Sequence, residues 1–458
     1  MRREDAFRDD GRGDGLARRL RRNRLTRRDV LWLFGAASGA AAAAGLSGCA
    51  ISPATGERII VGISEERERA IDREVAPHQF SRDLGAVQDG ELNRYVTEVG
   101  TRLHRLSHRP TMPYSYRVLN ANYVNAYTFP GGAMAVTRGI VTELDDEAQL
   151  AALLGHEIGH VNARHAAQRQ GKAMLAQAAV IGLGVAVSDS PLGGLFVFAG
   201  QLGASALLAS YSRDNEREAD ALGQRYLVEG GYPADGMTRL HALLVREQKA
   251  KPSLLATMFS SHPMSAERLQ TAQHLAQTQY AASLSANPQR ERFMDQTAAL
   301  RRLKPAIEAC KNGEMALAAR KLSEAEGHFG TALKHAPQDY AAHVLMARCL
   351  AAQGRRGEAL RFAEASRQLY PQEAQAHKLA GALHLQAREP AQAYAAFDQF
   401  DRILPGDPGI AFLKGVSLDA MGDRPRAAAH YRAFLQSGAQ GKPAEFAAQR
   451  LQAFGASR

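Results

Sequence analysis

The C-terminal third of the chain repeats with a period of 34 residues, and this constrains the fold more than any other feature. Prolines, alanines and other small residues keep the register: Pro337, Pro371, Pro405, Ala325, Ala359, Ala393, Ala427, Gly313, Ala347, Gly381 and Gly415. Small residues allow two antiparallel helices to approach closely, and proline ends a helix because it lacks a backbone N–H. The period predicts four stacked helix pairs, with units at 306–339, 340–373, 374–407 and 408–441.

This pattern of small residues, an aromatic and a terminal proline resembles the tetratricopeptide repeat. The resemblance implies an all-α solenoid with a concave surface, which in such proteins usually holds a protein ligand. We therefore expect a protein partner on the repeats, with a spacer role as the alternative.

The first 48 residues are typical of an export signal. A basic stretch, "RRLRRNRLTRRD", precedes the apolar run "VLWLFGAASGAAAAAGLSG", in the order that secretory signals follow. The ending "LSGC" resembles a bacterial lipoprotein box, which implies that Cys49 becomes the lipidated first residue and tethers the protein to a membrane. Arg27 and Arg28 fit a twin-arginine signal. An uncleaved membrane anchor is the alternative.

The net charge of +10 gives little indication of a nucleic-acid partner. The first 48 residues hold eleven arginines and six acids, so they contribute half of it. The remaining 410 residues carry about +5 and contain no run of five Lys or Arg. We therefore expect no nucleic acid among the partners.

Composition and the positions of proline and glycine divide the rest of the chain. Residues 49–62 are predicted to be a polar tether, 63–285 a first globular domain, 286–305 a linker helix, and 442–458 a C-terminal tail. Cys310 and Cys349 are expected to be two small buried residues. A disulfide between them stays open as an alternative in an exported protein.

Within the first domain, residues 143–170, "ELDDEAQLAALLGHEIGHVNARHAAQRQ", are predicted to form one helix with Asp146 as its cap. His156 and His160 lie four residues apart and therefore on one helical face. Glu157 is turned from His156 by about 100°. This is the H-E-x-x-H pattern of two zinc ligands and a general base. The alternative is a core helix with satisfied histidines, in which an unpaired Glu157 carboxylate would be costly.

In such sites zinc lowers the pKa of a water molecule, so Glu157 is the expected acceptor of its proton. The same carboxyl can then return the proton to the leaving amine. The pattern thus predicts hydrolysis of peptide bonds.

A catalytic zinc usually has three protein ligands. The metzincin spacing is excluded because positions 163 and 166 are both alanine. In the predicted helix "SRDNEREADALGQRYL", Glu216 and Asp220 share a face. Glu216 is the expected third ligand, and Asp220 is expected to accept a hydrogen bond from a ligand histidine. A solvated charged face is the alternative.

Residues from about 60 to 280 resemble the HtpX and CAAX-prenyl-protease-like family of zinc metallopeptidases. Four ordered segments carry the resemblance, namely "NAYTFPGGAMAVTRGIV", "HEIGH", "NEREAD" and "SHPMSAERL". It implies a gluzincin-type domain with a small β-sheet and one Zn²⁺ held by His156, His160 and Glu216, with Glu157 as the base. It also implies that the strand around "PGGAMAV" is the edge strand that pairs with the substrate backbone.

His262 and Arg268 lie in the last of these segments. His262 could donate a hydrogen bond to the developing oxyanion, with Arg268 nearby. It could instead fill the open position of the zinc and keep the enzyme latent, or simply form a turn with Pro263. His165 is expected to be structural. Residues 172–187 and 192–209 are expected to form a helical hairpin over the site or at the membrane surface, with a membrane-spanning pair as the alternative.

These features together predict a mostly helical α+β chain, a metalloprotease domain followed by an all-α repeat solenoid. The combination resembles envelope proteases that remove misfolded or stalled outer-membrane proteins. We therefore expect a lipid-anchored zinc endopeptidase on the periplasmic side of the envelope, and the resemblance implies a place at the outer membrane. The alternative is a chaperone or assembly scaffold whose zinc site is latent or blocked.

Overall fold

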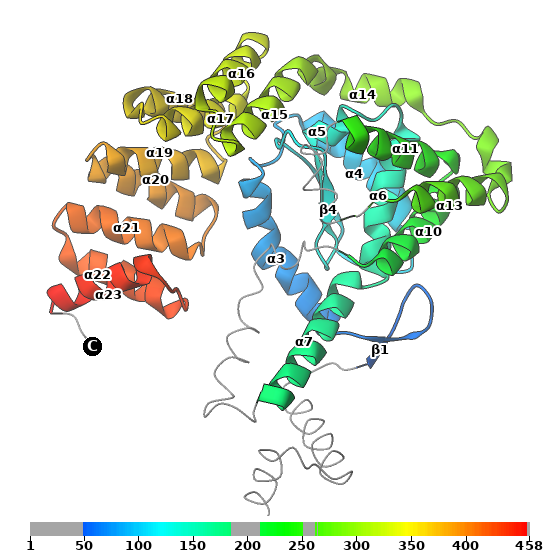
Figure 1. Cartoon of the computed structure of the whole chain (residues 1–458), viewed down its shortest axis with the longest axis horizontal. Coiled ribbons are helices and arrows are strands. Elements are labelled where there is room, and N and C mark those ends of the chain that lie inside the picture. Colours follow the sequence, from blue (N-terminus) through cyan, green and yellow to red (C-terminus); the bar gives the residue numbers. More distant parts are fainter. Residues whose placement is uncertain (1–48, 185–210, 251–261, 263, 456–458) are drawn as a thin grey trace, which may run out of the picture.

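The computed structural model describes residues 49–184, 211–250, 262 and 264–455. Figure 1 shows an N-terminal domain with a small sheet among helices, followed by a curved array of helix pairs. The predicted fold class, mostly helical α+β followed by a repeat solenoid, is confirmed. The export signal predicted for residues 1–48 lies outside the described part of the chain.

The segment predicted to be a tether is instead a β-hairpin. Strand β1 (Cys49–Ile51) pairs antiparallel with β2 (Arg58–Ile60), and Cys49 lies opposite Ile60. Gly56, at φ 73°, adopts the left-handed conformation that the connecting turn needs. The proline and glycine that indicated irregular backbone belong to the turn between the two strands.

The main sheet has the strand order β3-β5-β4. Strand β3 (Ser115–Leu119) runs parallel to β5 (Ala133–Thr137), and β4 (Ala126–Thr128) runs antiparallel to β5. The expectation that the "PGGAMAV" strand lies at the edge is wrong, because β5 has a neighbour on each side and the edge strands are β3 and β4. Residue alternation identifies strands and a turn but does not fix the order in which they pair.

Helices cover both faces of this sheet. Helix α3 (Glu65–Arg82) packs Ile71 and Phe80 against one face. On the opposite face lie α4 (Gly90–His104) and α6 (Glu147–Asn162), whose side chains share a core with Val118 and Val136. All residues of α6 are buried, so this helix runs through the middle of the domain.

The helix predicted over residues 143–170 is in fact two helices. Asp146 caps α6 as expected, accepting a hydrogen bond from the Gln149 amide at 3.0 Å. Helix α6 ends at Asn162, and α7 (His165–Gly184) begins after a turn in which Arg164 has a φ of 56°. The buried Arg164 side chain donates to Glu68 and to the Ile63 carbonyl, which stabilises this turn.

Helix α7 contains the start of the predicted helical hairpin, and residues 185–210 lie outside the described chain. Among the described residues, no helix has the length and apolar character needed to cross a membrane.

Helix α10 (Arg213–Glu229) packs directly against α6. A Cβ atom at Gly159 would lie 2.8 Å from the Ala219 carbonyl oxygen, and one at Gly223 would lie 2.7 Å from the His156 amide nitrogen. Glycine is therefore required at this crossing, and the close approach brings the histidines of α6 beside the acids of α10. The domain is completed by α5 (Arg138–Val141), α11 (Asp235–Ala250), α13 (Ala266–Gln277), a 3₁₀ turn (Ala281–Ser285) and α14 (Arg290–Arg302).

Four helix pairs follow with the 34-residue period: α15 (Lys304–Ala318) and α16 (Leu322–His335), α17 (Tyr340–Ala352) and α18 (Arg356–Leu369), α19 (Ala374–Gln386) and α20 (Pro390–Ile403), α21 (Pro408–Ala420) and α22 (Arg424–Gln436). Gly313, Gly381 and Gly415 face the rings of Phe329, Phe397 and Tyr431. Cys310 and Cys349 are buried and not bonded to each other. Part of the predicted tail forms α23 (Lys442–Ala453), whose Ala447 and Leu451 pack with the last pair.

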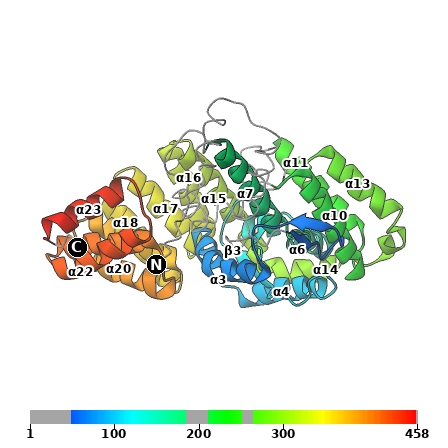
Figure 2. The ribbon, with the colours of Figure 1, turned by 90° about the horizontal axis from the view of Figure 1, so that it is seen from below.

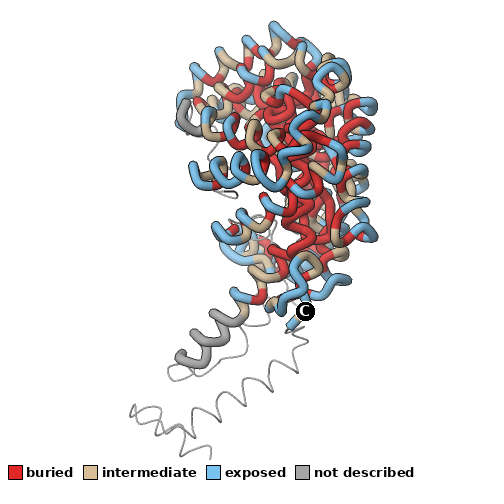
Figure 3. The backbone as a smooth tube through the Cα atoms, turned by 90° about the vertical axis from the view of Figure 1, so that its right-hand side faces the viewer, coloured by how far each residue is buried: buried red, intermediate tan, exposed pale blue. Residues whose placement is uncertain are grey.

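The array curves back beside the first domain, so that α3 and α19 are neighbours (Figures 1 and 2). Arg138 on α5 forms a buried ion pair with Asp339, the N-cap of α17, at 2.6 Å. Figure 3 shows buried backbone running through the middle of the molecule, and Ser81 on α3 donates to Glu373 in the repeats. The two parts therefore share buried contacts.

Candidate metal centre

Four buried side chains converge where α6 and α10 cross: His156, His160, Glu216 and His262. The Nε2 atoms of His156 and His160 are 3.1 Å apart, and His262 Nδ1 is 3.3 Å from His156 Nε2. Glu216 Oε1 lies 3.4 Å from His160 Nε2 and 3.2 Å from His262 Nδ1. One atom from each residue thus points into a common space.

These separations fit a zinc ion. Zinc–nitrogen bonds of about 2.0–2.1 Å in a tetrahedron place neighbouring ligand atoms about 3.3 Å apart. The donor set of imidazoles and one carboxylate is also the type that catalytic zinc sites use. The four residues therefore form a chemically suitable metal centre.

Glu157 lies beside these four residues, but its carboxyl is not one of the groups that converge on the common space. Its side chain is only 2% exposed, and its Oε2 accepts no hydrogen bond from the described residues. Burial raises the pKa of Glu157, so the carboxyl takes up a proton more readily than an exposed one. A buried acid with one free oxygen is suited to accept and release a proton.

Asp220 lies beside the first histidine. Its Oδ1 lies 2.9 Å from His156 Nδ1 and 3.2 Å from His241 Nε2. Burial would raise the pKa of Asp220, but His241 and Arg268 outweigh it and hold the pKa well below its usual range. Asp220 is therefore ionised, which orients the His156 ring with Nε2 toward the common space.

Arg268 contacts the two carboxylates of α10. It donates to Asp220 at 2.6 and 2.7 Å, and its Nη1 lies 2.7 Å from Glu216 Oε2. Burial would raise the pKa of Glu216, yet the nearby histidines lower it strongly. In this structure Arg268 pairs with Glu216 and Asp220. Its place near an oxyanion stays a prediction.

His262 joins the group rather than standing apart in a turn. Its Nδ1 faces Glu216, and its Nε2 lies 3.6 Å from Glu157 Oε1. Burial would lower the pKa of His262, but Glu157 and Glu216 raise it above the usual value. Of the three roles considered from the sequence, occupation of the fourth position around the metal agrees best with this geometry.

His165 was expected to be structural, and the structure places it against the ligand-type residue His160, a contact that the sequence did not predict. Its Nδ1 lies 2.9 Å from His160 Nδ1, and its Nε2 lies 3.1 Å from Glu218 Oε2. The helix break at Arg164 turns His165 back toward the site. Tyr211 stacks on the face of the His160 ring, with the two ring centroids 4.0 Å apart. His160 is thus contacted by His165 at Nδ1 and by Tyr211 on its ring face.

The sequence profile of peptidase family M48 matches residues 91–276, which include all of these site residues. The metalloprotease LoiP of Escherichia coli K12 is 30% identical over 214 residues, covering 45% of this chain and 80% of LoiP. The chain belongs to peptidase family M48. This agrees with the family that the sequence motifs indicated. Membership implies a metal, and the donor geometry fits that implication.

Two longer relatives are similar to part of this chain. The beta-barrel assembly-enhancing protease of Yersinia pestis is 30% identical over 226 residues, covering 47% of this chain and 46% of that protein. The protein of the same name from Escherichia coli K12 is 30% identical over 198 residues, covering 42% and 40%. The chain thus spans about half the length or less of these curated relatives. A tetratricopeptide repeat profile matches residues 316–383, as the period predicted.

Proposed function

We propose that the chain is a zinc-dependent endopeptidase of the cell envelope that cleaves misfolded or stalled polypeptides. The convergence of His156, His160 and Glu216 beside Glu157 is the observation that supports this most strongly. The alternative of a core helix with satisfied histidines does not account for a fourth ligand-type side chain at the same point.

The chain's own residues account for the proton transfers. Zinc bound there would polarise the scissile carbonyl and make water a better nucleophile. Glu157 would accept a proton from the attacking water and then donate it to the leaving amine. Asp220 and His165 hold the two ligand histidines in place from behind. The substrate backbone would align along β4, an edge strand of the sheet that packs against α6.

We propose outer-membrane proteins as the substrates and a protein partner on the repeats. Support comes from the relatives named for enhancing β-barrel assembly and from the repeat array itself. The basic charge is too diffuse to favour a nucleic acid.

We also propose that Cys49 carries the lipid anchor, on the periplasmic face of the outer membrane. Cys49 is exposed at the start of the β1–β2 hairpin. Ile51 and Ile60 are 67% and 45% exposed, and Ile60 is the cross-strand partner of Cys49. This apolar face is suited to rest on a bilayer. Mass spectrometry of the membrane fraction should find acyl groups on Cys49, and an unmodified cysteine would contradict the anchor.

The catalytic proposal is tested by casein cleavage with purified protein and with Glu157→Gln. We expect the variant to lose at least a hundredfold in rate while retaining its metal, because only the proton acceptor is removed. Glu229→Ala, an exposed change on α10, serves as the control and should be fully active. Equal cleavage by Glu157→Gln and the control would refute the mechanism.

A latent or blocked site, in a chaperone or scaffold, is the second candidate, and the position of His262 favours it specifically. If His262 occupies the fourth metal position, His262→Ala should raise casein cleavage. A loss would instead assign His262 to oxyanion stabilisation, and no change would make it structural. If the parent and His262→Ala both bind metal and neither cleaves casein, the scaffold role is favoured.

A further inference from the structure

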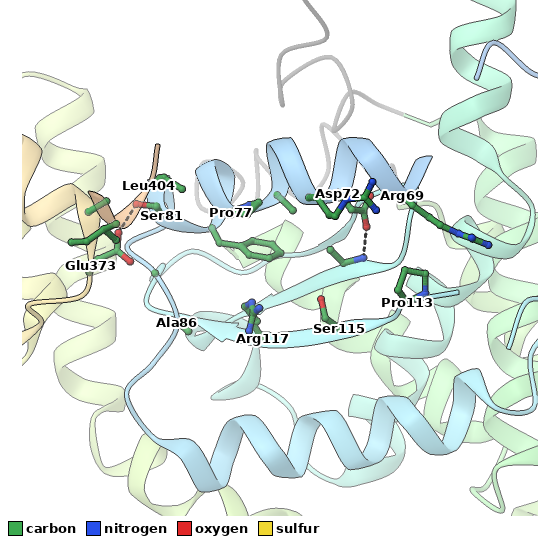
Figure 4. A pocket seen from close by; sticks show the side chains of 17 residues that line it. Arg69, Asp72, Pro77, Ser81, Ala86, Pro113, Ser115, Arg117, Glu373 and Leu404 are labelled. Atoms are coloured by element: carbon green, nitrogen blue, oxygen red, sulfur yellow. Dashed lines mark hydrogen bonds between the residues drawn. The ribbon is translucent and has the colours of Figure 1, made fainter. Parts of the chain in front are cut away.

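A second pocket lies on the opposite side of the sheet from the metal centre. It has a volume of about 500 Å³ and is enclosed by α3, by β3 and by the repeats at Glu373 and Leu404. Figure 4 shows Pro77 and Asp72 on the helix side, with Ser115 and Arg117 on the strand side. No residue of the metal centre lines it.

The pocket carries positive charge that the described protein does not neutralise. Arg73 and Arg117 are both exposed, and neither forms an ion pair with a residue that the structure describes. Arg69 also lines the pocket, and its only ion pair is a 3.9 Å contact with the partly exposed Glu65. Three guanidinium groups thus border one concave space.

The two acids in the pocket are already engaged. Asp72 accepts hydrogen bonds from the amides of Gly131 and Ala133 at 2.7 and 2.6 Å, and burial raises its pKa to about 7. Glu373 accepts from the Ser81 hydroxyl and from the Gln375 amide, and burial also raises its pKa. The charge of Arg73 acts on Asp72, but neither carboxyl forms an ion pair with Arg73 or Arg117, and both are already held by other donors.

The size and the apolar part of the lining indicate what could bind. Phe80, Pro113 and Leu404 contribute apolar surface, and the Arg117 guanidinium lies 5.9 Å from the Phe80 ring centroid. A cavity of this volume is in the range of sites for organic ligands, and an inorganic anion would fill only a small part of it. A polypeptide segment that carries both carboxylates and apolar side chains matches this lining.

We propose that this pocket is a non-catalytic binding site for an acidic segment of a polypeptide, whose carboxylates pair with Arg73 and Arg117. Arginine is suited to this because its planar donors match a carboxylate in pairs. The site would hold a protein ligand between the peptidase domain and the repeats. It does not depend on hydrolysis, so it stands or falls separately from the proposed activity.

The test uses the full mature chain with Glu157→Gln, which prevents cleavage of the probe. The probe is a fluorescein-labelled ten-residue peptide with four glutamates, followed by anisotropy. A peptide in which glutamines replace the glutamates is its matched control. We expect the acidic peptide to bind at least tenfold more tightly, and Arg73→Glu with Arg117→Glu to remove that preference.

Two further variants keep the result interpretable. Arg73→Gln with Arg117→Gln should weaken binding by an intermediate factor without adding repulsion. Arg94→Glu makes the same change in net charge as Arg73→Glu or Arg117→Glu alone, but at an exposed site on α4. It should leave affinity within twofold. Zinc content, measured on each variant, should be unchanged because the pocket shares no residue with the metal centre.

Unchanged affinity in both double variants would overturn the proposal, and so would equal binding of the glutamine peptide. Inorganic phosphate distinguishes a small-anion site. We expect it to displace the peptide no better than chloride at the same ionic strength, and selective displacement by phosphate would overturn the polypeptide assignment.

Discussion

The peptidase domain and the repeat array are both mainly helical, but their helices are held together differently. In the peptidase domain, buried charges connect distant segments. Glu68 accepts from Arg109 at 2.7 Å and from Arg164 at 2.9 Å, joining α3 to the end of α6. In three of the four repeat pairs, a glycine faces an aromatic ring from the partner helix. One region depends on ion pairs at defined geometry and the other on the fit of small and large side chains.

The difference shows what each region is suited to do. Buried charges are costly unless each one is paired, so they fix a single arrangement of the segments that carry them. A metal centre needs that arrangement, since its ligands come from three segments. Stacked repeats need only contacts with their neighbours, which gives an extended surface for a partner.

Replacing Arg138 with methionine should have the largest effect on stability, because it breaks the buried ion pair between the two regions. We expect a loss of about 3–5 kcal/mol in unfolding free energy, since Asp339 would remain buried without its partner. Denaturant unfolding measures this. Adding Asp339→Asn should recover part of the loss, and a single variant as stable as the parent would show that the ion pair does not join the regions.

Zinc removal should distinguish the two regions most clearly. At a free zinc concentration a hundredfold above Kd, the ion adds about 2.7 kcal/mol to the stability of the part that binds it. Chelation should therefore increase hydrogen exchange in α6 and α10 while leaving α17 to α20 unchanged. Equal increases in both regions would contradict a metal centre confined to the peptidase domain.

Gly381→Leu should damage the repeats alone. A Cβ at this position would lie 2.6 Å from Phe397 Cε1, so the helices of that pair must separate. We expect about 1–3 kcal/mol of destabilisation, the usual range for overpacking, with zinc content and casein cleavage retained. Lost metal in this variant would show that the regions are less independent than their packing indicates.

Gly330→Ala is the smallest change and serves as the matched control for Gly381→Leu. Gly330 is in α16, and a Cβ there meets nothing within 4 Å. We expect stabilisation of up to about 1 kcal/mol, because alanine favours a helix more than glycine does. Calorimetry should show that Gly381→Leu lowers the unfolding free energy and that Gly330→Ala raises it. A lower unfolding free energy for Gly330→Ala would argue against the fit of small and large side chains as the main determinant of repeat stability.

Local spacing explains what could be predicted from the sequence. His156, Glu157 and His160 lie on one helix, where four-residue spacing fixes their relation. The repeat helices follow from a period that needs only neighbouring contacts. Glu216 could be predicted only from a motif on a second helix. The close approach of α6 and α10 at their glycines confirms that the two helices meet.

Features that depend on distant contacts were missed. The contact of His165 with His160 was missed because nothing local indicates that the helix breaks at Arg164, whose side chain donates to Glu68 and to the Ile63 carbonyl. The order β3-β5-β4 depends on pairing across the sheet. The hairpin after Cys49 and helix α23 lie in short polar stretches, where weak patterns favoured irregular structure.

The most direct test is the zinc content of the purified chain and of Glu216→Ala, with Glu229→Ala as a control from the same helix. We predict one zinc per chain in the parent and in the control. We predict a large loss in Glu216→Ala after dialysis, because the carboxylate from α10 completes the ligand set. A full equivalent of zinc retained by Glu216→Ala, or none bound by the parent, would contradict the metal centre described above.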